Sequence, residues 1–436
     1  MIRQLEASHT TWDVLVIGGG ATGLGIAVDA ATRGYKTLLL EQSDFAKGTS
    51  SRSTKLIHGG VRYLAQGRLK LVLEALKERD VLLQNAAHVV KKQAFVVPVY
   101  SWWDAFIYFC GLKLYDLLAG SRSLGPAGFL DKKATLKALP TLKAAGLKGG
   151  IRYLDCQFDD SRLAINLAQT AAENGACILN YVRVTELLKD AQGKICGVTA
   201  QDLETGRQYN PKASAVINAT GVFADAVLQL EQPGAKPLIQ PSQGIHLVVE
   251  RSFLPGQDAL MIPKTPDRRV LFAVPWQNKL LLGTTDTLRD EPELEPVALE
   301  QEISFILHTA AGYLLKSPAR KDVLSVFAGL RPLAAHQGNP KATKDISRNF
   351  KVILSDNKLA TVTGGKWTIY RKMAEDTLDT LIHAKLLPAQ PCKTAHYPIH
   401  GHSTDATTNS HLAAYGTDAG AIEQLILEDA ALKMLL

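Results

Sequence analysis

The 436-residue sequence has little cysteine and no long uninterrupted hydrophobic stretch. Its five cysteines are scattered without a C-x-x-C pair, which argues against a disulfide framework or a metal site and favours buried thiols in a reducing compartment. The N-terminus has neither the apolar core of a signal peptide nor a clear transit peptide. These absences predict a cytoplasmic protein that needs no metal ion.

Low-complexity tracts and internal repeats are also missing, and 46% hydrophobic with 21% charged residues is typical of a folded chain. The length suits one large two-lobed unit or two to three domains. Lys and Arg outnumber Asp and Glu by 49 to 42, which indicates an anionic partner: a phosphorylated substrate, an acidic membrane surface or nucleic acid. No basic run interleaved with aromatics and no zinc-finger spacing is present, so we set nucleic acid aside.

Residues 100–116 are dense in aromatics, but Asp104, Lys113 and Asp116 interrupt them, so we do not expect a membrane-spanning helix. The segment suits a membrane surface, because aromatics favour the bilayer interface and the nearby cations Lys113, Arg122, Lys132 and Lys133 would meet anionic lipid headgroups. A buried core helix is an equal alternative, since periodicity does not separate the two.

A strand-turn-helix-strand unit opens the chain. A buried strand is predicted over 13–17, an alanine-rich helix over 24–32 and a second strand over 35–40, ending at Glu41. Between strand and helix, Gly18 allows a tight turn, Gly20 lets the backbone approach a pyrophosphate, and Gly23 lets helix and strand pack closely. Glu41 can accept hydrogen bonds from ribose hydroxyls. This context favours a dinucleotide site over a glycine-rich turn without a ligand.

Later segments continue both lobes of such a protein. We expect a helix over 162–174 capped by residues 159–161, then a small antiparallel insertion over 177–217 that returns through a small-residue turn at 218–221. Residues 240–345 are rich in strand patterns, with a helix within 298–315. A strand at 359–363 leads into a helix over 369–386. A polar linker follows Pro388, and a helical pattern starts at Asn409.

Five further segments make the pattern specific: Thr49–Tyr63, Asn218–Gly221, Gly283–Asp286, Gly329–Leu333 and Gly364–Arg371. With the opening unit, they closely resemble the flavin-dependent glycerol-3-phosphate dehydrogenases and oxidases, a branch of the amino-acid-oxidase-like flavoproteins, from about Trp12 to Leu386. The resemblance implies FAD as cofactor and oxidation of sn-glycerol 3-phosphate to dihydroxyacetone phosphate, with hydride transfer from C2 to flavin N5. It also implies a helical C-terminal domain, of which this sequence holds the beginning.

The fold class predicted in this way is α/β. A Rossmann-type FAD-binding lobe with a mostly parallel sheet would join a substrate lobe with a mixed or antiparallel sheet. The predicted boundaries are 12–90, 156–239 and 351–388 for the FAD-binding lobe, 91–155 for a substrate- or membrane-facing segment, 240–350 for the substrate lobe, and 389–436 for a linker and the start of the helical domain.

The resemblance also suggests site residues. Arg331, supported by Arg62 and Tyr63, would clamp the phosphate, because guanidinium presents a planar fork that stays charged. His246 would take the C2 hydroxyl proton, against the alternative of a packed core histidine. Lys366 would place positive charge near flavin N1 and O2 or reach the substrate phosphate. Arg371 is expected in a solvent-exposed ion pair.

His58 is expected to contact the flavin rather than act as a base. The residues predicted to bind the cofactor are Gly18, Gly20, Gly23, Glu41, Thr49, Ser50, Ser51, Leu56, His58, Gly59, Val184, Gly221, Gly365, Lys366 and Thr368.

Alternatives remain for the acceptor and the activity. We favour a membrane quinone as electron acceptor, on a protein peripheral to the cytoplasmic face of the membrane; molecular oxygen, as in an oxidase that yields hydrogen peroxide, is the alternative. An amino-acid or hydroxy-acid oxidase would use the same architecture with an Arg and a Tyr on a carboxylate. A non-catalytic, membrane-docked flavin redox sensor is the alternative outside enzymes. The sequence predicts no oligomeric state.

Overall fold

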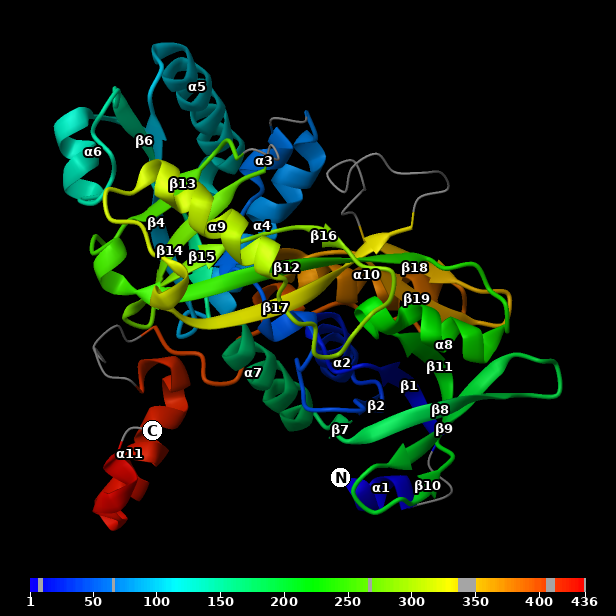
Figure 1. Cartoon of the computed structure of the whole chain (residues 1–436). Helices are drawn as coiled ribbons and strands as arrows, with labels where there is room; N and C mark the ends of the chain where they lie inside the picture. The colour runs from blue at the N-terminus through cyan, green and yellow to red at the C-terminus, as the bar shows by residue number, and fades with distance from the viewer. Residues whose placement is uncertain (7–10, 65–66, 266–268, 336–349, 405–411, 435–436) are drawn as a thin grey trace.

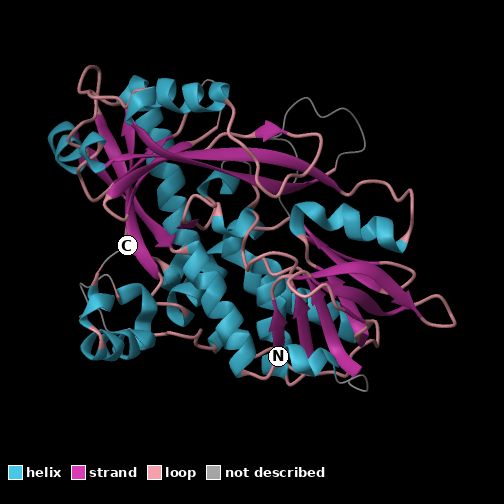
Figure 2. Ribbon diagram, turned by 60° about the horizontal axis from the view of Figure 1, so that its bottom comes forward, coloured by secondary structure: helices cyan, strands magenta, loops and turns pink. Residues whose placement is uncertain are grey.

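The computed structural model describes residues 1–6, 11–64, 67–265, 269–335, 350–404 and 412–434, apart from the side chains of Arg62, Tyr63 and Ala430. Two sheets dominate the described part, with helices between and around them (Figures 1 and 2).

The first sheet has a parallel centre. Its five central strands lie in the order β19 (Leu359–Thr363), β11 (Lys212–Asn218), β1 (Thr11–Ile17), β2 (Thr37–Leu40) and β7 (Cys177–Leu179). Antiparallel strands extend it: β8 (Val182–Lys189), β9 (Ile195–Asp202), β10 (Gln208–Tyr209) and β18 (Lys351–Leu354). The central strands are rich in apolar residues because both faces of the sheet are covered.

Helices bury one face of this sheet: α2 (Ala21–Arg33), α7 (Asp160–Glu173) and α10 (Tyr370–His383) share one apolar core with it. The predicted elements are confirmed with shifted ends. Helix α2 begins at Ala21 and ends at Arg33, and its C-cap is Gly34, whose φ of 95° is the left-handed conformation that favours glycine. As expected, Asp159 caps α7 by accepting a bond from the Arg162 N–H.

The second sheet is mixed, as predicted for the substrate lobe. Its order is β16 (Thr287–Leu288), β12 (Ile239–Glu250), β15 (Lys279–Gly283), β14 (Leu271–Trp276), β13 (Ala259–Ile262), β4 (Val90–Val99), β6 (Gly149–Phe158) and β3 (Leu56–Ile57). Strand β17 (Val323–Ala334) pairs along β12, and β5 (Gly128–Asp131) pairs with β6. Segment 91–155 therefore supplies strands to the same sheet as residues 240–334.

The remaining helices lie around these sheets. They are α1 (Ile2–Glu6), α3 (Val61–Leu64), α4 (Leu69–Asn85), α5 (Trp102–Ala119), α6 (Lys132–Ala138), α8 (Ala224–Glu231), α9 (Glu300–Tyr313) and α11 (Ala419–Glu428). Helix α9 packs on the core of the mixed sheet, inside the predicted range 298–315. The helical start predicted at Asn409 lies outside the described residues.

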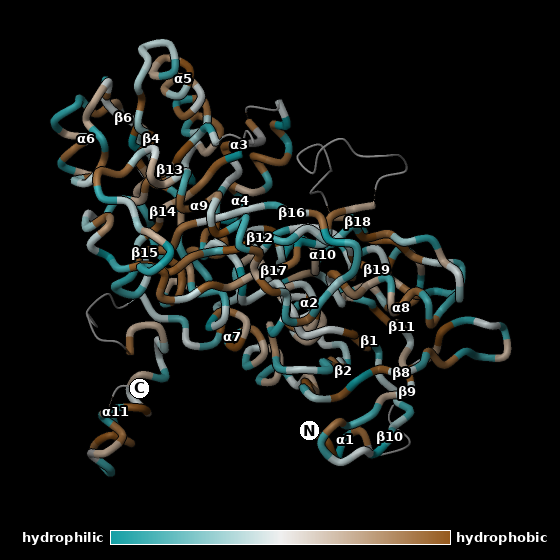
Figure 3. The backbone as a smooth tube through the Cα atoms, viewed as in Figure 1, coloured by the Kyte–Doolittle hydropathy of each residue, from teal (hydrophilic) through white to brown (hydrophobic). Residues whose placement is uncertain are grey.

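Helix α5 projects at the periphery, away from the parallel sheet (Figures 1 and 3). The alternative of a fully buried helix is wrong, because only one side of α5 packs inward. The outward side chains, which we call the α5 apolar face, are Trp102, Trp103, Phe106, Ile107, Leu114 and Leu117. None of the described helices is both long enough and apolar enough to cross a bilayer.

The expectation of buried thiols holds for Cys156 and Cys177 but is wrong for Cys110, which is exposed on α5. Cys196 and Cys392 are half-buried. The error has a physical cause: cysteine is often buried as a small hydrophobe, but a position on the outward side of an edge helix decides its exposure.

Candidate cofactor and substrate site

A cavity of about 690 Å³ lies where the two sheets meet. From the parallel sheet it is lined by the turns that follow β1, β2, β11 and β19, and from the mixed sheet by side chains of β12, β14 and β17. Because parallel strands end at a common edge, their turns gather on one side of the cavity.

The glycine-rich turn enters this cavity at the start of α2. Gly18 has a φ of 108°, and a Cβ on it would lie 2.7 Å from the Ala219 carbonyl oxygen. A Cβ on Gly23 would overlap the Gly18 carbonyl oxygen. Gly20 is the N-cap of α2 and lines the cavity with Gly18. The N-terminus of α2 therefore lies at the cavity, where the helix dipole favours an anionic group.

Glu41, at the end of β2, reaches back to this turn. Its Oε2 accepts a bond from the Gly19 N–H at 2.7 Å, and its Oε1 accepts one from the Ser43 N–H at 2.8 Å. Burial raises the pKa of Glu41, while these two amide bonds act in the opposite direction. The carboxylate lines the cavity, as predicted for a ribose contact.

Segment 49–60 crosses from the glycine-rich turn toward the mixed sheet. The Ser50 hydroxyl accepts a bond from the Ala21 N–H at 2.9 Å, and the Ser50 carbonyl accepts one from the Trp367 indole at 2.8 Å. Thr49 donates to the Leu330 carbonyl at 2.5 Å. These bonds tie the segment to both lobes.

Most residues predicted to bind the cofactor line the cavity: Gly18, Gly20, Glu41, Thr49, Ser50, Leu56, His58, Val184, Gly221, Gly365, Lys366 and Thr368. Gly23 instead packs behind the turn, as predicted for a glycine that lets helix and strand pack closely. Ser51 and Gly59 are not among the lining residues. The Ser51 carbonyl accepts a bond from Lys55 Nζ at 2.7 Å, and a Cβ on Gly59 would overlap the Tyr115 hydroxyl.

Arg331 extends from β17 into the mixed-sheet end of the cavity. Its Nη1 donates to the Thr285 carbonyl at 3.0 Å, and its Nη2 donates to Thr284 Oγ1 at 2.9 Å. A Cβ at position 244 would overlap this guanidinium, so Gly244 leaves the room in which it lies. The predicted clamp residue is thus oriented by its own lobe.

His246 lies beside it on β12 and is 2% exposed. Its Nε2 is 2.9 Å from Thr54 Oγ1, and its ring stacks on Phe327 with centroids 4.9 Å apart. Burial, followed by the charges of Arg331 and Lys55, holds the pKa of His246 well below 6.5. The imidazole is therefore neutral at neutral pH.

Lys366 lines the cavity at the N-terminal end of the short helix Trp367–Ile369. It follows Gly364 and Gly365, whose φ values of 76° and 90° turn the chain after β19. Thr368, two residues further on, donates to the His58 carbonyl at 3.5 Å. The predicted Arg62 and Tyr63 belong to α3, but their side chains lie outside the described residues.

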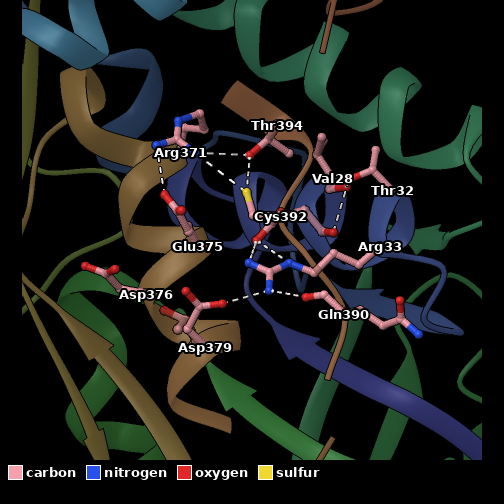
Figure 4. Close-up of polar contacts among 12 residues, drawn as sticks. Val28, Thr32, Arg33, Arg371, Glu375, Asp376, Asp379, Gln390, Cys392 and Thr394 are labelled. Carbon is pink, nitrogen blue, oxygen red and sulfur yellow. Dashed lines mark hydrogen bonds and ion pairs between the residues drawn. The ribbon is translucent and has the colours of Figure 1, made fainter. Parts of the chain in front are cut away.

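Arg371 is not on the surface, and the prediction of a solvent-exposed ion pair is wrong. It is 5% exposed, and its Nη2 and Nε donate to both carboxylate oxygens of Glu78 at 2.6 and 2.7 Å. Figure 4 shows its further contacts with Glu375, Cys392 and Thr394. The reason is tertiary: α4 and the segment near Thr394 cover the side of α10 that carries Arg371.

Arg33 forms a second buried cluster beside the first (Figure 4). It pairs with Asp29 at 2.8 Å and Asp379 at 2.7 Å, and donates to the Gln390 carbonyl at 3.0 Å. The two arginines thus fix the segment after Pro388 to α2 and α10, outside the cavity lining.

Several cavity residues were not predicted. Thr54 lines the cavity and contacts His246 Nε2. Its neighbour Lys55 is not among the lining residues; it is bonded to Asp160 Oδ1 at 2.5 Å, and its Nζ lies 5.4 Å from the centroid of the Phe327 ring. Asp160 was predicted only as part of a helix cap. Arg269 and Asp286 line the cavity close to Arg331. Thr54, Lys55 and Asp286 lie inside the segments Thr49–Tyr63 and Gly283–Asp286 that carry the resemblance, but no role was predicted for them. Arg269 lies outside these segments and reaches the cavity only through the tertiary fold.

Residues 13–371 match the family model described as FAD dependent oxidoreductase (DAO). The chain belongs to this family. FAD is therefore its cofactor, as the sequence predicted, and the α/β fold with its parallel FAD lobe agrees with the family. The lining fits FAD: a glycine turn that side chains would fill, an open helix N-terminus, and an acidic residue at the end of β2.

Relatives of this FAD dependent oxidoreductase include "Glycerol-3-phosphate dehydrogenase, mitochondrial" of Homo sapiens, 45% identical over 399 residues, which are 88% of this chain and 54% of that protein. The protein of the same name from Schizosaccharomyces pombe is 41% identical, over 88% of this chain and 63% of that one. The chain thus spans about half to two thirds of the length of these curated relatives.

Among solved structures, the glycerol-3-phosphate dehydrogenase from Bacillus halodurans complexed with FAD matches with a TM-score of 0.76 and 32% identity, over 99% of this chain and 75% of that one. The glycine oxidase from Geobacillus kaustophilus matches with a TM-score of 0.64 at 19% identity, over 90% of this chain and 99% of that one. The second likeness shows the fold alone.

Proposed function

We propose that this FAD dependent oxidoreductase oxidises sn-glycerol 3-phosphate to dihydroxyacetone phosphate. The observation that carries the proposal is the convergence of Arg331, His246 and Lys366 on the cavity that also contains the glycine-rich turn. The names of the relatives and of the Bacillus halodurans structure support the same substrate. The chemistry that FAD supplies when bound is acceptance of the hydride from C2.

Arg331 binds the phosphate in this proposal. Thr284, Thr285 and the guanidinium lie together at the mixed-sheet end, so the anion is held away from the glycine-rich turn. A planar guanidinium suits two phosphate oxygens at once. The phosphate thereby positions C2 and its hydroxyl deeper in the cavity, which is the positioning that a hydride transfer needs.

His246 accepts the proton of the C2 hydroxyl. A base must be unprotonated before it acts, and the lowered pKa of His246 provides this at neutral pH. Thr54 and Phe327 fix the ring. Lys366 places a cation at the same cavity, where it favours the negative charge of substrate or cofactor.

The test is an anaerobic titration of the FAD-loaded full chain with glycerol 3-phosphate. We expect the oxidised flavin absorbance band to bleach with this substrate at concentrations at which glycerol and amino acids leave the band unchanged. His246→Gln should keep FAD bound and bleach at least about 100-fold more slowly, as expected for loss of a general base. Failure of glycerol 3-phosphate to bleach the wild-type band would reject the substrate.

We further propose that the protein docks peripherally on the cytoplasmic face of a membrane and passes electrons to quinone. The α5 apolar face supports docking: Trp103 is 71% exposed and Leu117 75% exposed. Trp103 stacks on Phe106, and exposed Lys113, Arg122, Lys132 and Lys133 lie on α5 or in the segment that follows it. Aromatics with cations match an anionic lipid interface.

Co-sedimentation with vesicles of anionic or neutral lipid tests docking. The double variant Trp103→Ser/Phe106→Ser should lose most binding to anionic vesicles. The control Val297→Ser/Leu324→Ser removes equally exposed apolar side chains elsewhere and should bind as wild type does. If both double variants bind anionic vesicles equally well, the α5 apolar face is not the docking surface.

The acceptor is tested separately, by admitting a quinone analogue or oxygen to the bleached protein. Faster return of the flavin band with the quinone analogue supports a dehydrogenase. Faster return with oxygen supports the alternative, an oxidase that yields hydrogen peroxide.

A further inference from the structure

A buried carboxylate bridges two arginines at the mixed-sheet end of the cavity. Asp286 follows β15, and its side chain is 2% exposed. The Ser242 hydroxyl donates a bond to its Oδ1. Arg331 Nη1 lies 3.5 Å from Oδ1, and Arg269 Nη1 lies 3.5 Å from Oδ2. One guanidinium thus lies at each oxygen of Asp286.

Arg269 is held in this place by its backbone as well as by Asp286. Its N–H donates to Thr265 Oγ1 at 2.9 Å, and its carbonyl accepts bonds from the Thr265 N–H at 3.2 Å and the Thr265 hydroxyl at 3.0 Å. The side chains of Arg269 and Arg331 are 19% and 23% exposed, and both line the cavity. Arg269 is therefore an accessible and fixed cation beside the predicted clamp residue.

The charge and the hydrogen-bond donors at this end favour an anionic ligand with several acceptor oxygens. Two guanidinium groups and one carboxylate leave a net positive charge, and neutral His246 does not change it. A phosphomonoester carries between one and two negative charges and three acceptor oxygens near neutral pH, whereas a carboxylate carries one charge and two oxygens. The fork of Arg331 on β17 and the fork of Arg269, just before β14, can share the three oxygens of a phosphate.

We infer that Arg269 is a specificity-determining residue: positioned by Asp286, it forms the second fork of the clamp and selects a phosphomonoester over a carboxylate substrate. This rests on the proposed function, in which the substrate is a phosphomonoester. The fold alone does not make this choice, since it is shared with a glycine oxidase.

The experiment uses the FAD-loaded full chain and the variants Arg269→Gln and Arg269→Lys. Arg289→Gln is the matched control: Arg289 is 24% exposed, pairs with Glu293 at 2.7 Å and does not line the cavity. Binding of inorganic phosphate is followed by its perturbation of the flavin absorbance spectrum. Reduction by glycerol 3-phosphate and by glycerol at high concentration is measured on the same proteins.

Loss of one charge-assisted fork should weaken phosphate binding by about 10- to 100-fold in Arg269→Gln. Arg269→Lys keeps the charge without the fork and should show an intermediate loss, and Arg289→Gln should match wild type. The ratio of kcat/KM for glycerol 3-phosphate over that for glycerol should fall with Arg269→Gln. Such a fall separates a phosphate contact from a general structural defect, which would lower both values together.

The inference is overturned if Arg269→Gln binds phosphate within about threefold of the wild-type affinity. It is also overturned if Arg269→Gln and Arg289→Gln lose the same amount of phosphate affinity. If glycerol 3-phosphate does not reduce the wild type while phosphate binding still depends on Arg269, the clamp stands and the proposed substrate fails. If glycerol 3-phosphate reduces the wild type and phosphate binding ignores Arg269, the proposed substrate stands and the clamp fails.

Discussion

Gly18→Ala is the most direct test of the cofactor cradle, because two independent effects oppose a side chain there. The backbone at Gly18 has a φ of 108°, which L-residues rarely adopt. The new Cβ would also lie 2.7 Å from the Ala219 carbonyl oxygen and 3.1 Å from Thr220 Cα. The backbone at Gly18 cannot easily move to relieve this contact, because the Gly18 N–H donates to the Leu40 carbonyl at 2.9 Å.

The two effects can be given separate magnitudes. A left-handed conformation costs an L-residue about 1–2 kcal/mol. Forcing a methyl group into a packed region costs about 1–3 kcal/mol more. We therefore expect Gly18→Ala to lower the free energy of unfolding of the apoprotein by about 2–5 kcal/mol. If the glycine-rich turn moves to relieve this contact, its backbone amides no longer lie in the right place for the FAD phosphates. The affinity for FAD should therefore fall at least about tenfold.

Two control glycines separate these terms. Gly34 has a φ of 95° with no atom within 4 Å of its added Cβ, so Gly34→Ala reports the backbone strain alone. Gly111 lies within α5, also with open space, and Gly111→Ala should stabilise the helix by up to about 1 kcal/mol. Urea unfolding of the apoproteins and FAD fluorescence titrations measure both quantities. Equal losses for Gly18→Ala and Gly34→Ala, or unchanged FAD affinity in Gly18→Ala, would refute the reasoning.

Three further predictions concern buried polar groups. Burial and two neighbouring cations lower the pKa of His246, so the unfolded chain binds its proton more readily and stability falls as pH drops below 6.5, by up to about 1.4 kcal/mol per pH unit. His246→Gln should remove this part of the pH dependence in urea unfolding at pH 7.5 and 5.5; an unchanged dependence contradicts it. Glu78→Gln leaves Arg371 without its buried partner and should cost about 3–5 kcal/mol, also by urea unfolding, and a loss below about 1 kcal/mol would show that the pair is dispensable. Tyr115→Phe removes the hydroxyl that donates to Asp155 at 3.1 Å and should cost about 1–3 kcal/mol by the same measurement, whereas a neutral result would mean that Asp155 finds another donor.

Sequence patterns predicted the features whose constraints are local. The turn at Gly18, the capped helix after Asp159 and the acidic end of the second strand are each encoded within a few residues. The resemblance added Arg331 and His246, which the structure brings to one cavity. The local features that the structure confirms share a cause: backbone conformation and short motifs can be read directly from neighbouring residues in the sequence. The roles of Arg331 and His246 stay predictions.

Tertiary partners left no such trace. Arg371 was expected in solvent because a helix position alone does not reveal that Glu78, almost 300 residues earlier, lies opposite it. Asp286 and Arg269 meet Arg331 only after β14, β15, β12 and β17 of the mixed sheet have paired. The sequence also did not predict which side of α5 faces outward, because an aromatic-rich helix suits a protein core as well as a membrane surface.

The order in which the sheets are assembled has a consequence for synthesis. Strand β19 closes against β11 in the parallel sheet, and its last residue, Thr363, follows the first strand by most of the chain. Along the chain, segments that supply strands to the parallel sheet alternate with segments that supply strands to the mixed sheet. Neither sheet can therefore be completed early in synthesis. We expect the emerging chain to stay open to chaperones and proteases until translation has passed this strand, and the cofactor to be captured late. Added FAD should therefore protect the finished chain from proteolysis and leave nascent chains that end before β19 unprotected.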